Sequence, residues 1–170
     1  MTGFGAVMNN RRYVTPTQAS ARGEYFCPAC SSRLDLVQKR KHPYFRHKSR
    51  KDCKLHAGHP SESREHLHAK HYLVHIIEER GLTVNGVHIP AVRRDATRSV
   101  VLEKRVNTTR SYIVLDVAVI DAQGDVLYGF EVSKSHKTDM TTRKGFPAWE
   151  IAHDVIRAID CGQGSVSIQT

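Results

Sequence analysis

The spacing of apolar positions changes along this 170-residue chain, and each spacing predicts a different kind of element. Between about residues 62 and 80, apolar residues recur every three or four positions, which predicts a helix with one core-facing side. Ser61 is a suitable cap for the first turn of this helix, and Gly81 follows its last turn. The residues with this spacing are Ala69, Leu73, Ile76 and Ile77.

Beyond residue 81 the apolar period becomes two, which is typical of half-buried strands. Strands, a short helix and a last element follow, in the order α-β-β-β-α-β when the first helix is included. The pattern therefore predicts an α+β core at residues 61–170. The elements after the first helix are strands 99–105, 112–120 and 125–132, a helix at 137–144, and a strand or helix at 149–159.

The first sixty residues follow a third pattern, in which brief β-like runs are separated by polar and basic stretches. Apolar positions here are too few to build a core without help. We therefore expect residues 1–60 to form a small β-rich module that a bound metal stabilises. Its β-like runs are residues 12–15, 25–26, 34–37 and 44–45.

Charge separates the same two regions. Residues 1–60 contain 12 Lys and Arg against 3 Asp and Glu, whereas residues 61–170 contain 14 against 14, so the net charge of +9 belongs to the first region. Basic side chains that neutralise phosphates release counterions and give sequence-independent affinity, which makes nucleic acid the leading partner. The alternative is a solvated basic surface with no polyanion bound.

The four cysteines could form two disulfides, but no apolar run is long enough for a signal peptide or a membrane span. We therefore expect a cytoplasmic protein with no membrane partner and with reduced cysteines. Cys161, beside Gly162 and Gly164, is expected to be an ordinary free thiol.

The other cysteines have the spacing of zinc ligands. Cys27 and Cys30 form a Cys-x-x-Cys turn, which places two sulfurs at a suitable separation. Cys53 supplies a third thiolate, and either His47 or His56 completes four ligands. We favour His47, with His56 as the alternative. A structural zinc ion would make the folding of this module metal-dependent.

Two carboxylates in apolar strands suggest a second metal site. Asp116 lies in the middle of an apolar run, where an unpaired carboxylate is costly to bury, and Glu131 lies near the end of the next strand. Carboxylate oxygens on neighbouring strands suit magnesium or manganese. Such an ion can activate water for attack on a phosphodiester, so hydrolysis of a nucleic acid is the expected chemistry.

The first predicted helix carries further candidates for this site. Glu62, His66 and Lys70 are spaced four residues apart and share one side of the helix. Glu62 or Glu65 could add an oxygen ligand, His66 could orient water or phosphate, and Lys70 could stabilise developing negative charge. The alternative interpretation of such residues is a solvated helix face.

In this order the motifs resemble the competence protein CoiA-like family, which is similar in fold to nucleases of the PD-(D/E)XK type. The resemblance covers roughly residues 22–155 and implies a zinc-binding module followed by a restriction-endonuclease-like core that acts on DNA. In that pattern Asp116 and Glu131 match the metal-binding acids. The motifs are Phe26-Cys-Pro-Ala-Cys30, Tyr44-Phe45-Arg46-His47, Cys53, Glu62-Ser63 with His66 and Lys70, Asp116-Val117, and Phe130-Glu131-Val132-Ser133 with Ser135.

One position departs from the nuclease pattern. Where the pattern has Glu-x-Lys, this chain has Ser133, and Lys134 falls on the opposite side of a regular strand. Lys70 or Lys144 could supply the ammonium from another element. The leading hypothesis is a magnesium- or manganese-dependent DNA nuclease, for which a homodimer would suit cleavage of both strands. Its rivals are a non-catalytic zinc-finger DNA-binding protein on the same scaffold and an RNA-binding or ribosome-associated zinc protein.

Overall fold

The chain forms two compact units, Met1–His71 and Tyr72–Thr170, and the boundary between them falls within helix α2 (Arg64–Glu79). This computed structural model describes residues 5–9, 12–38, 42–48, 53, 63–93, 95–107, 111–133, 140–143, 145–159 and 166–168. Within these residues no helix has the length and apolar character that a bilayer crossing requires.

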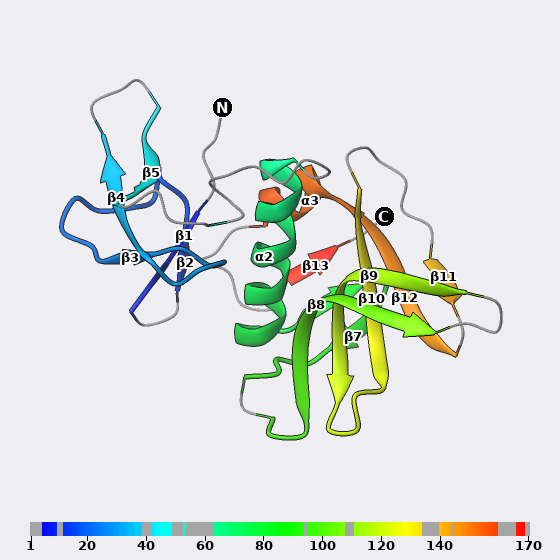
Figure 1. Cartoon of the computed structure of the whole chain (residues 1–170). Coiled ribbons are helices and arrows are strands. Elements are labelled where there is room, and N and C mark those ends of the chain that lie inside the picture. The colour runs from blue at the N-terminus through cyan, green and yellow to red at the C-terminus, as the bar shows by residue number, and fades with distance from the viewer. Residues whose placement is uncertain are drawn as a thin grey trace. The chain divides into compact units, whose positions relative to one another are not determined.

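The first unit contains an antiparallel five-stranded sheet in the order β2-β1-β3-β4-β5 (Figure 1). The four β-like runs expected here are all strands, and β1 is an additional short strand beside two of them. The strands are β1 (Ala6–Met8), β2 (Tyr13–Val14), β3 (Tyr25–Phe26), β4 (Arg33–Val37) and β5 (Tyr44–His47).

Buried side chains of this sheet form one small cluster. The rings of Tyr25 and Phe45 pack with their centroids 4.9 Å apart. Two of the buried members are cysteines, so the core and the expected metal ligands occupy the same place. The cluster consists of Ala6, Val14, Tyr25, Cys27, Leu34, Phe45, Cys53 and Leu67.

The second unit contains a mixed sheet in the order β11-β12-β10-β9-β8 and a smaller sheet in the order β13-β6-β7. Strands β8, β9 and β10 are successive antiparallel neighbours, and β12 runs parallel to β10. The strands are β6 (Leu82–Val84), β7 (Val87–Ile89), β8 (Arg98–Asn107), β9 (Tyr112–Asp121), β10 (Val126–Ser133), β11 (Met140–Arg143), β12 (Phe146–Ala152) and β13 (Val166–Ile168).

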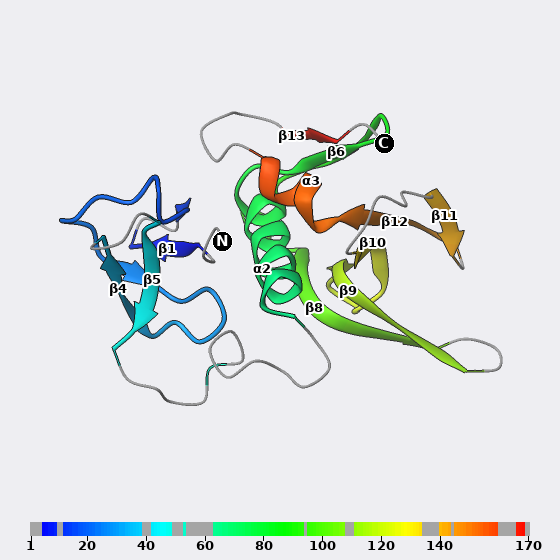
Figure 2. The same ribbon diagram turned by 90° about the horizontal axis from the view of Figure 1, so that it is seen from above.

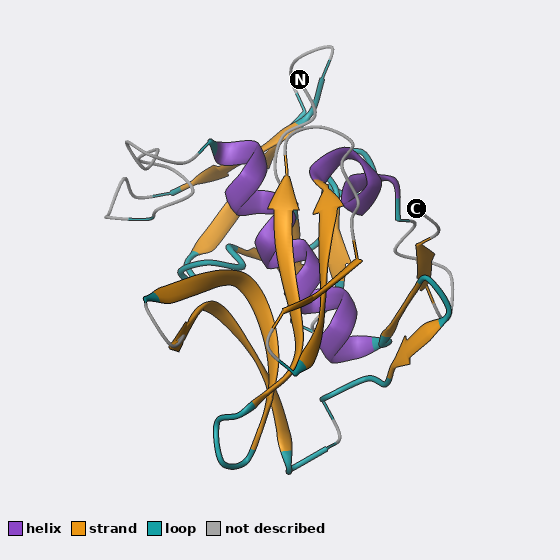
Figure 3. Cartoon of the chain, turned by 90° about the vertical axis from the view of Figure 1, so that its right-hand side faces the viewer, coloured by secondary structure: helices purple, strands orange, loops and turns teal. Residues whose placement is uncertain are grey.

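Residues 72–79 of α2 cover one face of the mixed sheet, as Figures 1 and 3 both show. Leu73, Ile76 and Ile77, the apolar stripe expected from the sequence, are at most 2% exposed. Gly81 ends the helix with a φ of 76°, where a Cβ would lie 2.5 Å from the carbonyl oxygen of Ile89. The helix period thus predicted both the helix and its buried face.

The start of α2 differs in detail from the expectation. The hydroxyl of Ser63 accepts a hydrogen bond from the main-chain N–H of His66 at 3.3 Å, so Ser63 caps the first turn. Ser61, the cap expected from the sequence, lies outside the described residues.

The α+β class is confirmed, but the second helix was placed wrongly. Residues 140–143 of the expected helix 137–144 form strand β11, which pairs antiparallel with β12. The remaining residues of that prediction lie outside the described part. The segment at 149–159 contains both alternatives, because β12 continues to Ala152 and α3 (His153–Ala158) follows directly.

Candidate metal centre and carboxylate row

A tight turn between β3 and β4 positions the first two cysteines. The N–H of Cys27 donates to the carbonyl of Ser32 at 2.9 Å, and the N–H of Ser31 donates back to the carbonyl of Cys27 at 2.8 Å. Ser31 adopts a φ of 56°, a left-handed conformation that reverses the chain within this short segment. The turn brings Cys30 back toward Cys27, as the Cys-x-x-Cys spacing predicts.

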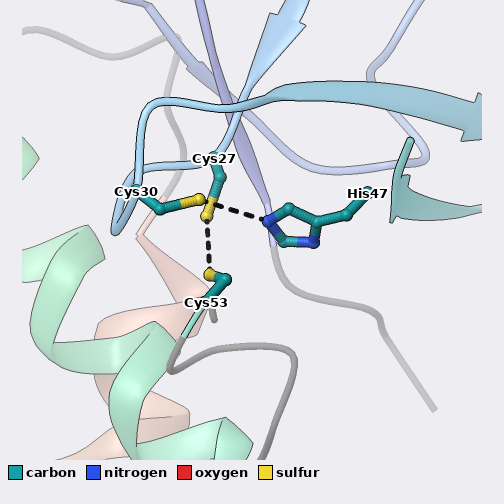
Figure 4. Close-up of side chains that lie close together, drawn as sticks. All are labelled: Cys27, Cys30, His47 and Cys53. Atoms are coloured by element: carbon teal, nitrogen blue, oxygen red, sulfur yellow. Dashed lines mark hydrogen bonds between the residues drawn. The ribbon is translucent and has the colours of Figure 1, made fainter. Parts of the chain in front are cut away.

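Cys27, Cys30, His47 and Cys53 converge from three segments (Figure 4). Their ligand atoms all lie within 4.8 Å of one another, and no other group of three or more His, Cys, Asp or Glu side chains in the described residues does so. The Sγ atoms of Cys27 and Cys53 are 3.5 Å apart, and Cys30 Sγ lies 3.4 Å from His47 Nε2.

These separations test whether the cluster fits zinc. A tetrahedron with zinc–sulfur and zinc–nitrogen bonds of ordinary length has sulfur–sulfur edges of about 3.8 Å and sulfur–nitrogen edges of about 3.6 Å. The two closest pairs therefore lie within a few tenths of an ångström of this geometry. A disulfide would require the two sulfurs to be about 2 Å apart, so Cys27 and Cys53 are separate thiols.

The electrostatics of the cluster also favour a bound cation. Burial raises the pKa of Cys27 far above its ordinary value, and the neighbouring Cys53 adds to the rise. Burial of Cys30 also acts to raise its pKa, but hydrogen bonds with Ser32 outweigh it and the pKa is lowered. A dication would reverse the cost of burying thiolates, because coordination deprotonates a thiol outright. The donor set therefore fits zinc, with His47 as the fourth ligand, while the alternative His56 lies outside the described residues.

The basic surface of the first unit is partly neutralised within the sheet. Asp35 on β4 pairs with Arg46 at 3.9 Å and with Lys48 at 3.7 Å, and Glu24 pairs with Arg33 at 3.1 Å. Seven of the twelve Lys and Arg in residues 1–60 lie outside the described part. The described residues of this region thus carry five Lys and Arg against two Asp and Glu, and three of these five basic side chains are in ion pairs.

Asp116 lies where regular pairing on both sides of β9 gives way. On one side Leu102 pairs with Val117 and Lys104 with Leu115, which leaves Asp116 opposite Glu103. On the other side, Asp116 Oδ2 accepts a hydrogen bond from the main-chain N–H of Val132 at 2.7 Å. A carboxylate therefore takes a ladder hydrogen bond that a main-chain carbonyl would normally accept. This bond orients the half-buried carboxylate from the strand that also carries Glu131.

The strand register places four carboxylates in one row of the sheet, which are Glu103, Asp116, Glu131 and Glu150. Glu131 pairs with Glu150 in the parallel pair β10–β12. The register of β9 and β10 reaches Phe130 opposite Val117, and its continuation puts Glu131 opposite Asp116. Like charges in direct register repel one another, so the row gains from a cation or a buried ammonium nearby.

Glu150 was missed in the sequence analysis. It alternates with buried neighbours on both sides, Trp149 and Ile151, which is the pattern that identified Asp116. The same pattern was present around Glu150, but the segment could not be assigned to a strand or a helix. The residues that lie on the same side of the element as Glu150 therefore could not be identified.

The candidates on α2 belong to the first unit, whereas Asp116 and Glu131 belong to the second. Glu65 is exposed and His66 is half-buried. Lys70 is only 3% exposed, which excludes the solvated-face alternative for this residue and means that its ammonium needs compensating partners. Glu62 lies outside the described residues, as do Lys134, Lys144 and Cys161.

A buried tyrosine–histidine pair in the first unit was also missed. The hydroxyl of Tyr13 lies 2.5 Å from His68 Nδ1 and 2.9 Å from Nε2, and their rings stack with centroids 5.5 Å apart. The N–H of Gly5 donates to the same hydroxyl at 3.0 Å. A Cβ on Gly5 would lie 2.3 Å from the Tyr13 ring, so only glycine fits. The pair joins β2 to α2 across 55 residues of sequence.

Comparisons of the chain with protein-family models, with curated proteins and with solved structures give no match.

Proposed function

We propose that this protein is a magnesium- or manganese-dependent DNA nuclease of the CoiA-like type, in which a basic zinc module holds the DNA. The observation that carries the proposal is the register of β9 and β10, whose continuation beyond Phe130 and Val117 brings Glu131 opposite Asp116, with Asp116 held by the N–H of Val132. Both side chains are half-buried, and carboxylates on adjacent strands are a donor set that suits magnesium or manganese.

The strand order supports a restriction-endonuclease-like core. Helix α2 precedes an antiparallel meander of β8, β9 and β10, and β12 then returns parallel to β10. Strands β6 and β7, which the sequence analysis did not expect, lie between α2 and β8 in the chain and pair in the smaller sheet; without them the order is α-β-β-β followed by another strand. Where the second helix was expected, residues 140–143 form β11 at the edge of the sheet.

Three side chains of the carboxylate row have a chemical role in this proposal. Asp116 and Glu131 would hold the magnesium or manganese ion, which polarises the phosphodiester and activates water when bound. The N–H of Val132 donates to Oδ2 of Asp116 and so fixes the orientation of this carboxylate. Glu150, the next carboxylate of the row, would act as a base for the attacking water rather than as a third ligand.

The sites on α2 contribute the remaining roles. Lys70 and Lys144 stay the two proposed replacements for the missing Glu-x-Lys lysine, and of these Lys70 is the one that the structure describes. We assign it to stabilising negative charge on the phosphate as the bond breaks. His66 and Glu65, together with Glu62, are then candidates for positioning water or phosphate.

A second candidate function is DNA binding without cleavage. It is favoured by Ser133, which stands where the nuclease pattern has lysine. In that case the zinc module would still bind the phosphate backbone, and the core would act as a scaffold.

Cleavage of labelled single-stranded, duplex and branched DNA separates the two candidates. The zinc-loaded protein is assayed with and without added magnesium or manganese, and without a chelator, which would also remove zinc. Asp116→Asn keeps an acceptor for the Val132 N–H while removing the charge, and Glu131→Gln does the same for the next strand. Asp125→Asn, an exposed carboxylate in the β9–β10 turn, is the matched control.

The nuclease proposal predicts cleavage that requires the added ion, that both charge-removing variants lose, and that Asp125→Asn retains. Tight binding with no cleavage of any of the three DNAs would overturn it in favour of the scaffold.

A further inference from the structure

Two large apolar side chains are strongly exposed in the described part of the chain, and they lie together. Tyr112 is 51% exposed and Val114 is 44% exposed, and they are two residues apart on β9, so they share a face. The strand register pairs them with Asn107 and Arg105 of β8, which are also exposed. We call the face formed by Arg105, Asn107, Tyr112 and Val114 the ribbon platform.

The platform combines a flat aromatic group with a flat cation. The guanidinium carbon of Arg105 lies 3.6 Å from the centroid of the Tyr112 ring, which is a close cation–π contact. Because both groups stand on paired strands, the contact holds the tyrosine ring in one orientation. The pair is therefore preorganised, and little side-chain entropy remains to be lost when a ligand stacks on it.

The backbone of β8 is irregular at one residue close to the platform. Glu103, in the middle of β8, has a φ of 53°, a conformation that is unusual for a residue other than glycine. Pairing resumes in the same register on its far side, where Lys104 lies opposite Leu115. Figure 2 shows the distal part of the β8–β9 ribbon curving past the other strands of the second unit.

Charge identifies the kind of ligand. Residues 104–107 and 111–115, the described distal part of the ribbon, contain Lys104 and Arg105 and no Asp or Glu. Residues 61–170 as a whole contain equal numbers of acidic and basic residues, so this positive charge is a local feature. An exposed aromatic ring beside uncompensated positive charge has the chemistry that binds a nucleic-acid strand, with bases on the ring and phosphates on the cations.

We propose that the ribbon platform binds unpaired bases of a DNA strand by stacking on Tyr112, with Arg105 contacting the phosphate backbone or a second base. The inference rests on the proposed function, because it takes DNA as the ligand, and it extends that function by assigning a preference for single-stranded or branched DNA. A base-paired duplex has no exposed base faces along its length, so it would not use the ring in this way.

The test compares three fluorescent probes of equal length: oligothymidylate, an abasic strand with the same phosphates, and a duplex. Fluorescence anisotropy at fixed salt gives the affinity of the wild type and of Tyr112→Ala, with Tyr112→Phe as the variant that keeps the ring. Tyr112→Ala is expected to weaken oligothymidylate binding about tenfold, the size of one base stack, and to change abasic and duplex binding less than about twofold. Tyr112→Phe is expected to bind like the wild type.

Arg105→Ala supplies a second readout. It is expected to lower the salt dependence of oligothymidylate binding by about 0.7 in the log–log slope, whereas Tyr112→Ala leaves the slope unchanged. Thermal unfolding followed by fluorescence of Trp149, which lies in the same unit, shows that each variant is folded.

Two outcomes overturn the ribbon platform alone. The first is wild-type DNA binding that Tyr112→Ala leaves intact on oligothymidylate. The second is a loss of affinity in Tyr112→Ala that is as large for the abasic or duplex probe as for oligothymidylate, which would mean that Tyr112 contacts DNA without stacking on a base. If the wild type binds none of the three probes, the proposed function fails together with the platform.

Discussion

The two units of this protein are stabilised by different means. The first has strands of two to five residues and one small buried cluster, two of whose members are metal-ligating cysteines. The second has strands of up to ten residues and fully buried large side chains such as Leu115, Phe130 and Ile151. A zinc ion bound at these cysteines would therefore be part of the core of the first unit, whereas the second unit has a large apolar core of its own.

This difference suggests a division of function as well as of stability. The first unit carries the excess positive charge and would hold DNA, and the second carries the carboxylate row and would perform the chemistry. Each of the following predictions affects one unit and leaves the other as an internal control.

Loss of the metal is expected to have the largest effect. Zinc binding at such sites contributes about 10 kcal/mol or more, which exceeds the stability of a small unit, so Cys53→Ser should unfold the first unit. The second unit should remain folded. Zinc content and far-UV circular dichroism report the first change, and fluorescence of Trp149, the single tryptophan, reports the second unit.

Cys161→Ser is the control, because it removes the one cysteine outside the cluster. It should bind a full equivalent of zinc. If Cys53→Ser retained zinc and its circular dichroism, the metal would not be part of the core.

A cavity in the second unit is expected to have the next largest effect. Phe130 is fully buried and stacks on Trp149 with ring centroids 5.5 Å apart. Phe130→Ala should lower the free energy of unfolding of this unit by about 3–5 kcal/mol and leave the zinc content unchanged. Urea denaturation followed by Trp149 fluorescence measures the change. Val114→Ala, at an exposed position of the same sheet, should cost less than about 0.5 kcal/mol; equal losses in the two variants would contradict this assignment of the core.

Acid should weaken the second unit through His75. Burial lowers the pKa of His75 to about 4, with Arg80 and Arg93 also lowering it and Glu79 opposing them. The unfolded chain, with an ordinary histidine pKa, is protonated first as pH falls. The stability that neutral His75 contributes is therefore complete above about pH 6.5 and is lost as pH falls toward about 4.

After allowance for partial solvent screening, the loss should be about 1–2 kcal/mol. Urea midpoints from Trp149 fluorescence at neutral and acidic pH measure it. His75→Gln should have a shallower pH dependence, and parallel curves for wild type and variant would remove His75 as the cause.

The smallest expected effect concerns the buried pair in the first unit. Tyr13→Phe removes the hydroxyl that accepts the Gly5 N–H and contacts His68. The first unit should lose about 1 kcal/mol, seen as a lower zinc affinity in chelator competition. Tyr112→Phe, whose tyrosine is half exposed, should change zinc affinity little, and a matching loss in both variants would point to a non-specific effect.

Sequence reasoning succeeded where the signal was local. Period-two runs with polar turns gave β3, β4, β5 and the β8–β9–β10 meander, and the Cys-x-x-Cys spacing gave two of the four ligands of the cluster. Long-range pairing was not predictable in this way. Strand β13 pairs with β6 from more than 80 residues away, and β11 is a strand only because β12 lies beside it.

The same limit applies to the candidate site. Asp116 and Glu131 stood out because each interrupts an apolar run within its own strand. Glu150 joins them only through the parallel register of β10 and β12, and Tyr13 meets His68 only through the fold. Such contacts depend on how distant segments align with one another, and a local sequence pattern does not predict that alignment.

Measuring DNA affinity and DNA cleavage in parallel tests the division of function most directly, using Cys53→Ser and Asp116→Asn in zinc-containing buffer with magnesium. The account predicts that Asp116→Asn binds DNA as tightly as the wild type does but cleaves it at least about a hundredfold more slowly. Cys53→Ser is predicted to bind DNA more weakly than the wild type. Magnesium-dependent cleavage that survives in Asp116→Asn, or DNA affinity that survives unchanged in Cys53→Ser, would contradict it.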